Sequence, residues 1–135
     1  MRWMNIVAAL SGVAALVMLV LASHALRATL TSEALDRIQL GAFIQLIAAA
    51  TGLALANRTG RLNAIAGGMI LGGAGLFALV LYTLSLTGKR SVAMLAPVGG
   101  ITLILGWVVL IFAKPRLRGD WLRRQRSKSP AGALL

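Results

Sequence analysis

The sequence predicts an all-α membrane protein, a bundle of four transmembrane helices in which neighbouring helices run antiparallel. Of the 135 residues, 59% are hydrophobic and only 13% are charged, whereas about a quarter of the residues in a soluble domain are charged. Four segments without Asp, Glu, Lys or Arg each contain at least 20 residues, enough for a helix to cross a hydrocarbon core of about 30 Å. The segments lack the apolar–polar alternation of a β-barrel, and a helix satisfies its own backbone groups inside lipid.

The first predicted helix covers residues 4–26. A cleavable signal peptide is the alternative, because "ASHA" at 22–25 offers small residues at the spacing of a cleavage site. The uncharged run from Ile6 to Ala22 is longer than the hydrophobic region of a signal peptide, which is usually about 7–15 residues. We therefore expect this segment to be retained as a membrane helix.

The second predicted helix covers residues 38–56 and follows the longest connection, residues 27–37. Ser32, inside this connection, can serve as an N-cap. Glu33 and Asp36 lie in the first turn after it, where carboxylates interact favourably with the helix dipole. Arg37 is four residues after Glu33, so these two side chains can form an ion pair.

The third and fourth predicted helices cover residues 62–87 and 92–113. They are joined by "TGKRS", whose Gly88 can end the third helix in a left-handed cap. Its adjacent lysine and arginine belong at a membrane edge, because a basic residue at the bilayer centre costs about 2.5–3.5 kcal/mol. The turn "NRTGR" at 57–61 is equally short, and such turns make neighbouring helices antiparallel.

The distribution of basic residues predicts the orientation. Four helices place ten basic residues on the side of both termini: Arg2, Arg58, Arg61, Lys114, Arg116, Arg118, Arg123, Arg124, Arg126 and Lys128. The other side has four: Arg27, Arg37, Lys89 and Arg90. Because cytoplasmic loops are enriched in Lys and Arg, we expect both termini to be cytoplasmic and the protein to lie in a bacterial plasma (inner) membrane.

The net charge of +11 arises mainly from the tail, residues 114–135. Basic residues just beyond a membrane helix attract anionic headgroups, and the residues expected to contact lipid are Arg116, Arg118, Trp121, Arg123, Arg124 and Arg126. Leu117, Trp121 and Leu122 could form the apolar edge of a short interfacial helix. Nucleic acid is not an expected partner, because the tail has one aromatic residue and no folded module. The end, after Ser127, is expected to be disordered.

Small residues recur at spacings that favour close packing between membrane helices. The residues expected at helix contacts are Gly12, Gly52, Gly68, Gly72, Gly75, Pro97, Gly99 and Gly100. On this basis Gly72→Leu should damage folding more than Leu71→Ala, because Leu71 points about 100° away from the small-residue stripe. A pore lined by glycine is the alternative, which a single chain of four helices does not favour.

Few polar groups fall inside the predicted spans, and each is a candidate functional residue. The three singled out are His24, Gln45 and Tyr82, and Gln45 is expected to hydrogen-bond across helices. His24 shares one side of the membrane with Glu33 and Asp36, but their spacing matches no zinc-ligand pattern. No cysteine, phosphate-binding loop or Ser/His/acid set is present, so we expect no metal, no cofactor and no enzymatic activity.

The segment "LYTLSLTGKRSVAMLAPVGGITLILGW" at 81–107 resembles the domain of unknown function family 423, which includes the transmembrane protein 256-like proteins. That family has an "LY-x-L-x-LTG" end to its third helix, a short turn, a "TPIGG" run and a "GW" pair. "SHAL" at 23–26 is similar to the family's "AHAL". The resemblance covers about residues 1–113 and implies a small four-helix membrane protein.

The chain departs from this family at two places. Family members usually carry a second histidine and tyrosines in the second helix, where this chain has Ile44 and Gln45. Polar serines and a glycine before the family's "LY" correspond to Ala78, Leu79 and Val80. A family site that depends on two histidines would therefore be incomplete here.

Two classes of function fit these observations. The first is a non-enzymatic accessory or assembly subunit of a larger membrane complex, because helices with small-residue faces can pack against partners as well as against each other. The alternative is an oligomeric channel or transport component. Four helices with one buried amide are too few for a carrier that acts alone.

Overall fold

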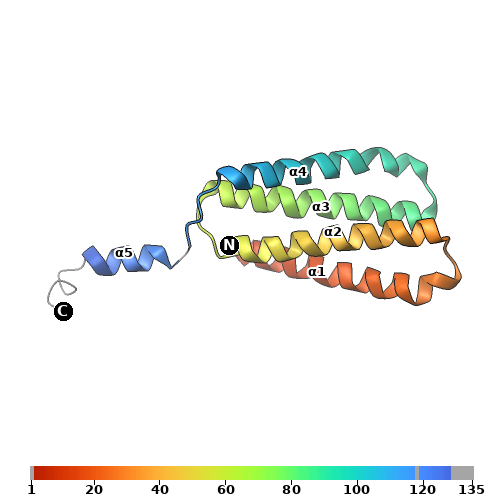
Figure 1. Cartoon of the computed structure of the whole chain (residues 1–135), viewed down its shortest axis with the longest axis horizontal. Coiled ribbons are helices and arrows are strands. Elements are labelled where there is room, and N and C mark those ends of the chain that lie inside the picture. Colours follow the sequence, from red (N-terminus) through yellow and green to blue (C-terminus); the bar gives the residue numbers. More distant parts are fainter. Residues whose placement is uncertain (1, 118, 129–135) are drawn as a thin grey trace.

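The computed structural model describes residues 2–117 and 119–128, and these residues form an up-and-down arrangement of long helices (Figure 1). Four helices are long and apolar enough to cross a membrane, as the sequence predicts. The elements are α1 (Arg2–Ser23), the 3-10 helix η1 (Ala25–Ala28), α2 (Ser32–Ala56), α3 (Arg61–Thr87), the 3-10 helix η2 (Arg90–Leu95), α4 (Ala96–Phe112) and α5 (Asp120–Lys128).

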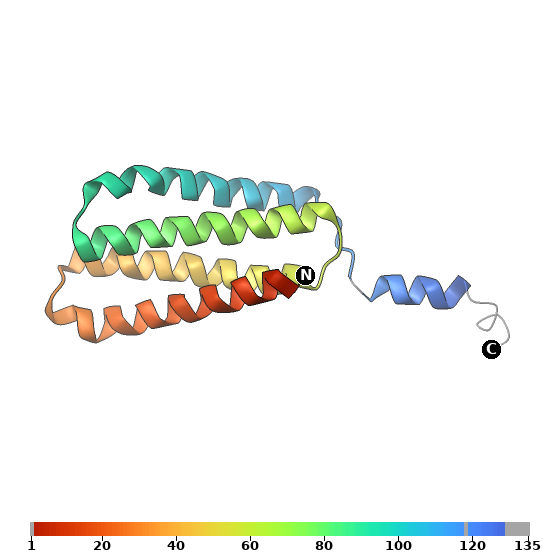
Figure 2. The same ribbon diagram turned by 180° about the vertical axis from the view of Figure 1, so that it is seen from behind.

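Helices α2 and α3 lie at the centre of the bundle, and α1 and α4 flank them on opposite sides (Figures 1 and 2). Helix α1 packs on α2 and touches α3, whereas α4 packs on α3; α1 and α4 do not meet. Within the most apolar stretch of each span, only 17% of the residues are buried in α1 and 11% in the fourth span, Arg90–Phe112, which comprises η2 and α4; the values are 44% in α2 and 50% in α3. The two outer helices therefore present most of their apolar surface to the membrane.

The core is built mainly from alanine, which allows helix backbones to approach closely. One cluster of buried residues lies toward the end that carries the termini: Met4, Ala8, Ala48, Leu55, Ala56, Ile70, Leu71 and Ala74. The second lies toward the opposite end: Ala15, Ala22, Ile38, Ala42, Ala78 and Tyr82. Because lipid tails are as apolar as leucine, van der Waals contact rather than hydrophobic burial holds such helices together.

Helix ends follow the predictions at some positions and differ at others. Gly88 ends α3 in the left-handed conformation, with φ at +69°, and its N–H donates to the Leu84 carbonyl at 2.9 Å. Helix α2 begins at Ser32 rather than at residue 38, and its N-cap is Thr31, whose side-chain oxygen accepts from the Ala34 N–H. A helix end in the headgroup region is solvated, so charged residues there do not end the helix.

The ends of α1 and α4 also differ from the predicted ranges. Helix α1 ends at Ser23, and the last two residues of the predicted span, 25 and 26, belong instead to the separate helix η1. The predicted start of the fourth helix, residue 92, lies in η2, and regular α-helix begins at Ala96 with Pro97 in its first turn. A proline there has no intrahelical N–H bond to lose, and Pro97 is exposed rather than packed against another helix.

Glycines mark the close helix contacts, but on a different face of α3 from the predicted one. A Cβ added at Gly52 would lie 2.8 Å from the Leu71 side chain, and one at Gly99 would lie 2.7 Å from the Phe77 backbone nitrogen. Gly12 makes an ordinary contact, 3.7 Å from Ala49. Gly73, which was not predicted, makes the tightest contact among the described glycines: its added Cβ would lie 2.5 Å from the Leu103 backbone nitrogen.

The prediction that Gly72 and Gly75 lie in helix contacts is wrong for the folded chain, because nothing lies within 4 Å of a Cβ added at either residue. Gly68 and Gly100 meet only a distant aromatic atom, at 3.9 Å. Helix α3 carries small residues on two faces, and it turns the other face toward α4. Leu71 is only 5% exposed. We therefore expect Leu71→Ala to damage folding more than Gly72→Leu, the reverse of the order predicted from the sequence.

Candidate functional site

Polar groups gather at three places in the bundle: inside it at Gln45 and Tyr82, at the end that carries the termini, and at the opposite end. Inside the bundle, the Tyr82 hydroxyl donates to the Gln45 Oε1 at 2.7 Å, which joins α3 to α2. Both residues are more than nine-tenths buried. The hydrogen bond that the sequence predicts for Gln45 across helices is thus formed, and Tyr82 is its partner.

This pair lies in the floor of a groove between α1 and α3, which we call the lateral groove. Its volume is about 390 Å³, and it is lined by Ala14, Val17, Met18, Gln45, Gly75, Leu79 and Tyr82. Among the described residues, none accepts a hydrogen bond from the Gln45 amide nitrogen. The lateral groove therefore combines an apolar wall, an uncovered glycine and a hydrogen-bond donor without a partner.

The tail is attached to the bundle at the end that carries the termini. The Asn63 Nδ2 donates to the Thr59 carbonyl at 2.9 Å and to the Lys114 carbonyl at 3.1 Å, and the Thr59 N–H donates to the Arg116 carbonyl at 2.9 Å. Asn63 is 2% exposed. Sequence reasoning missed this residue because it lies in the first turn of α3, where an amide is ordinary, and its partner on the tail, Lys114, is 51 residues away.

The predicted lipid-contacting residues follow this attachment. Arg116 is exposed next to the 57–60 turn, and Arg123, Arg124 and Arg126 are exposed on α5. Helix α5 leads away from the bundle (Figure 1) and contains Trp121. Arg118 and residues 129–135 of the expected disordered end lie outside the described residues, whereas Lys128, the first residue of that predicted end, belongs to α5.

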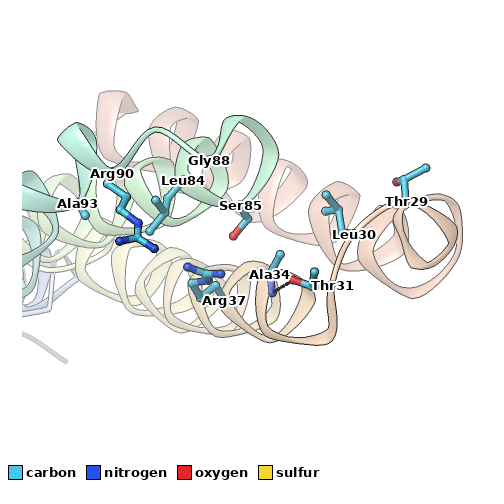
Figure 3. A pocket seen from close by; sticks show the side chains of 10 residues that line it. All are labelled: Thr29, Leu30, Thr31, Ala34, Arg37, Leu84, Ser85, Gly88, Arg90 and Ala93. Carbon is cyan, nitrogen blue, oxygen red and sulfur yellow. Dashed lines mark hydrogen bonds between the residues drawn. The ribbon is translucent and has the colours of Figure 1, made fainter.

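At the opposite end, a cavity of about 620 Å³ lies between the connection before α2, the start of α2, the end of α3 and η2 (Figure 3). We call it the basic cavity; its lining includes Thr31, Arg37, Leu84, Ser85, Arg90 and Ala93. The Arg37 Nε donates to the Glu33 carbonyl oxygen at 3.2 Å. The ion pair considered for these two residues is not formed, because Arg37 bonds the backbone and not the carboxylate.

His24 lies at none of these three polar sites. It is exposed at the start of η1, and its backbone N–H donates to the Val20 carbonyl at 3.1 Å. In the described part of the chain, no three His, Asp or Glu side chains come together as a metal-binding group. His24, Glu33 and Asp36 therefore do not form one there.

Four antiparallel helices of membrane-spanning length, with few polar side chains between them, define a small polytopic membrane protein. Residues 20–100 match the model of a family described as protein of unknown function (DUF423). This match covers more than half of the chain, from the end of α1 to the first turns of α4, and the protein belongs to that family. No curated protein and no solved structure matches the chain.

Proposed function

We propose that this protein is a non-enzymatic accessory or assembly subunit that joins a larger membrane complex through the lateral groove and through Gly72, which lies three residues before Gly75 on α3 and outside the groove lining. One observation carries the proposal. Gly72 and Gly75 are small residues on a membrane helix, and among the described residues nothing lies within 4 Å of a Cβ added at either one. Small residues let a second helix approach closely, and no helix of the described residues packs against these two.

The chemistry of the groove specifies the partner further. Its wall is apolar, and the amide nitrogen of Gln45 has no acceptor among the described residues. A partner helix that places a small or apolar side chain at Gly75, with a carbonyl, hydroxyl or amide oxygen toward Gln45, would complement both features. All three acidic residues, Glu33, Asp36 and Asp120, are exposed, which supports a role in binding rather than in acid–base catalysis.

The test is affinity purification of the tagged full-length chain from its native membrane in a mild detergent. Gly72→Leu combined with Gly75→Leu should fold, because both positions are open, yet lose the partner. Ala50→Leu is the matched control, since Ala50 is exposed on α2 and does not line the groove.

A defined heteromeric partner that is lost in the double variant and kept in the control supports the proposal. A stable homo-oligomer without another protein supports the channel or transport component instead. A monomer without a partner, or a partner retained equally by both variants, contradicts the role of the lateral groove.

A further inference from the structure

The basic cavity brings together two arginines that are far apart in the sequence. Arg37 lies in the second turn of α2 and Arg90 begins η2, and Figure 3 shows both guanidinium groups directed into the space between these elements. No carboxylate lines the cavity. Among the described residues neither arginine forms an ion pair, and the only side-chain hydrogen bond of Arg37 uses its Nε. The terminal nitrogens of both guanidinium groups therefore remain available to an anion.

A buried hydroxyl without a partner lies in the same cavity. Ser85 is 8% exposed, and its Oγ has no hydrogen-bond partner. Other hydroxyls on α3 behave differently: Thr83 donates to the Leu79 carbonyl at 2.8 Å and Thr87 to the Thr83 carbonyl at 2.6 Å. Ser85 makes no such bond to its own helix. Its side chain points from α3 toward α2 in Figure 3, so its hydroxyl can donate to a group held in the cavity.

The position of the cavity along the helices places it at the membrane surface. Helix α3 has 27 residues, and at a rise of about 1.5 Å per residue it is roughly 40 Å long, about 10 Å longer than a typical hydrocarbon core. If the excess is shared between the two ends, about three residues at each end extend into the headgroup region. Ser85 lies two residues before the end of α3, close to the depth of lipid phosphates.

We propose that the basic cavity binds a phosphate ester, with Arg37 and Arg90 holding the phosphate oxygens and Ser85 donating a hydrogen bond to one of them. Guanidinium groups match phosphate oxygens in geometry and charge, and a bound anion would relieve the repulsion between two unpaired cations. The cavity is larger than a single phosphate group. Leu30 and Leu84 also line it, so it offers apolar surface to the remainder of a phosphate ester.

The test uses the full-length protein in a mild detergent, with a short-chain phosphatidylglycerol and inorganic phosphate as separate probes. Binding is measured by native mass spectrometry for the lipid and by the shift in melting temperature for both probes. Arg37→Gln with Arg90→Gln should weaken binding by at least about tenfold, because two charge-assisted hydrogen-bonding groups are lost. Ser85→Ala should weaken it by about threefold or more, the effect expected for a single neutral hydrogen bond.

The matched control is Arg27→Gln with Lys89→Gln, which removes two charges from the same end of the bundle, at exposed residues that do not line the cavity. This control should retain binding within about twofold, because exposed charges are largely screened. If only the lipid binds, a lipid headgroup is the source of the phosphate. If the binding of inorganic phosphate depends on the same residues as the binding of the lipid, a soluble phosphate ester is the source.

Two outcomes would overturn the proposal. The first is that neither probe binds. The second is that the control substitutions weaken binding as much as the substitutions of the two cavity arginines. The arginines would then act only through the overall positive charge of this end of the bundle. If the double-arginine variant does not fold by circular dichroism, the single Ser85→Ala variant decides, and unchanged binding by this variant counts against the site.

Discussion

Gly72 and Gly73 are adjacent on α3 and should respond in opposite ways to the same substitution. A Cβ added at Gly73 would lie 2.5 Å from the Leu103 backbone nitrogen and 2.8 Å from the Gly99 carbonyl oxygen, whereas one added at Gly72 meets nothing within 4 Å. Both variants gain the same helix propensity, about 1 kcal/mol from glycine to alanine. The difference between the two therefore isolates the contact between α3 and α4.

The magnitude follows from the geometry at Gly73. Relieving a contact of 2.5 Å to an ordinary one of 3.4 Å requires α4 to move outward by about 0.9 Å, and a gap of 0.5–1 Å forfeits about a quarter to a half of each van der Waals contact. Backbone atoms on both sides leave no flexible side chain to absorb the change. Overpacking costs about 1–3 kcal/mol, so Gly73→Ala should lose about 1–3 kcal/mol of stability relative to Gly72→Ala.

Thermal or denaturant-induced unfolding in detergent, followed by circular dichroism, would measure this difference. Gly72→Ala should unfold at or above the temperature of the unchanged protein, and Gly73→Ala well below it. Equal effects of the two substitutions, or a larger loss for Gly72→Ala, would refute the assignment of the α3 face that packs on α4.

Four further predictions concern other parts of the chain. In a double-mutant cycle, Tyr82→Phe and Gln45→Leu should show a coupling of about 0.6 kcal/mol, and at most about 1.7 kcal/mol, in unfolding free energy, the mean and the maximum for hydrogen bonds between membrane helices; a coupling of zero would mean that the bond contributes nothing. Asn63→Leu should release residues 114–117 and speed tryptic cleavage after Arg116, while Asn57→Leu, in the neighbouring turn, should not; unchanged cleavage would show that Asn63 does not hold the tail. Reporter fusions at residue 135 and within 27–37 should report opposite sides of the membrane, with the C-terminus cytoplasmic; a periplasmic signal at residue 135 would reverse the orientation. A peptide of residues 114–128 contains Trp121 alone, and its emission should shift to the blue with anionic vesicles and return with salt; equal binding to neutral vesicles would exclude electrostatic attachment.

The sequence by itself determined the number of membrane helices, the short turns between them and the basic tail. These features depend on one property of each residue, whether it can lie inside lipid, and a charge at the bilayer centre has a large cost of its own. Gly88 was predictable for a similar reason, since a left-handed helix end favours glycine regardless of what surrounds it. Helix ends were less predictable because charged residues are tolerated once a helix emerges into the headgroup region, as Arg37 does in α2.

Only the tertiary structure decided which faces of the helices meet and which distant residues come together. Inside lipid, both faces of α3 are apolar and both carry glycine, so periodicity does not distinguish Gly72 from Gly73; shape complementarity to α4 does. The approach of Arg37 to Arg90, and of Asn63 to the Lys114 carbonyl, likewise depends on how α2, α3 and α4 pack. Such packing is the sum of many weak contacts between distant segments, so it cannot be predicted from any single residue of the sequence.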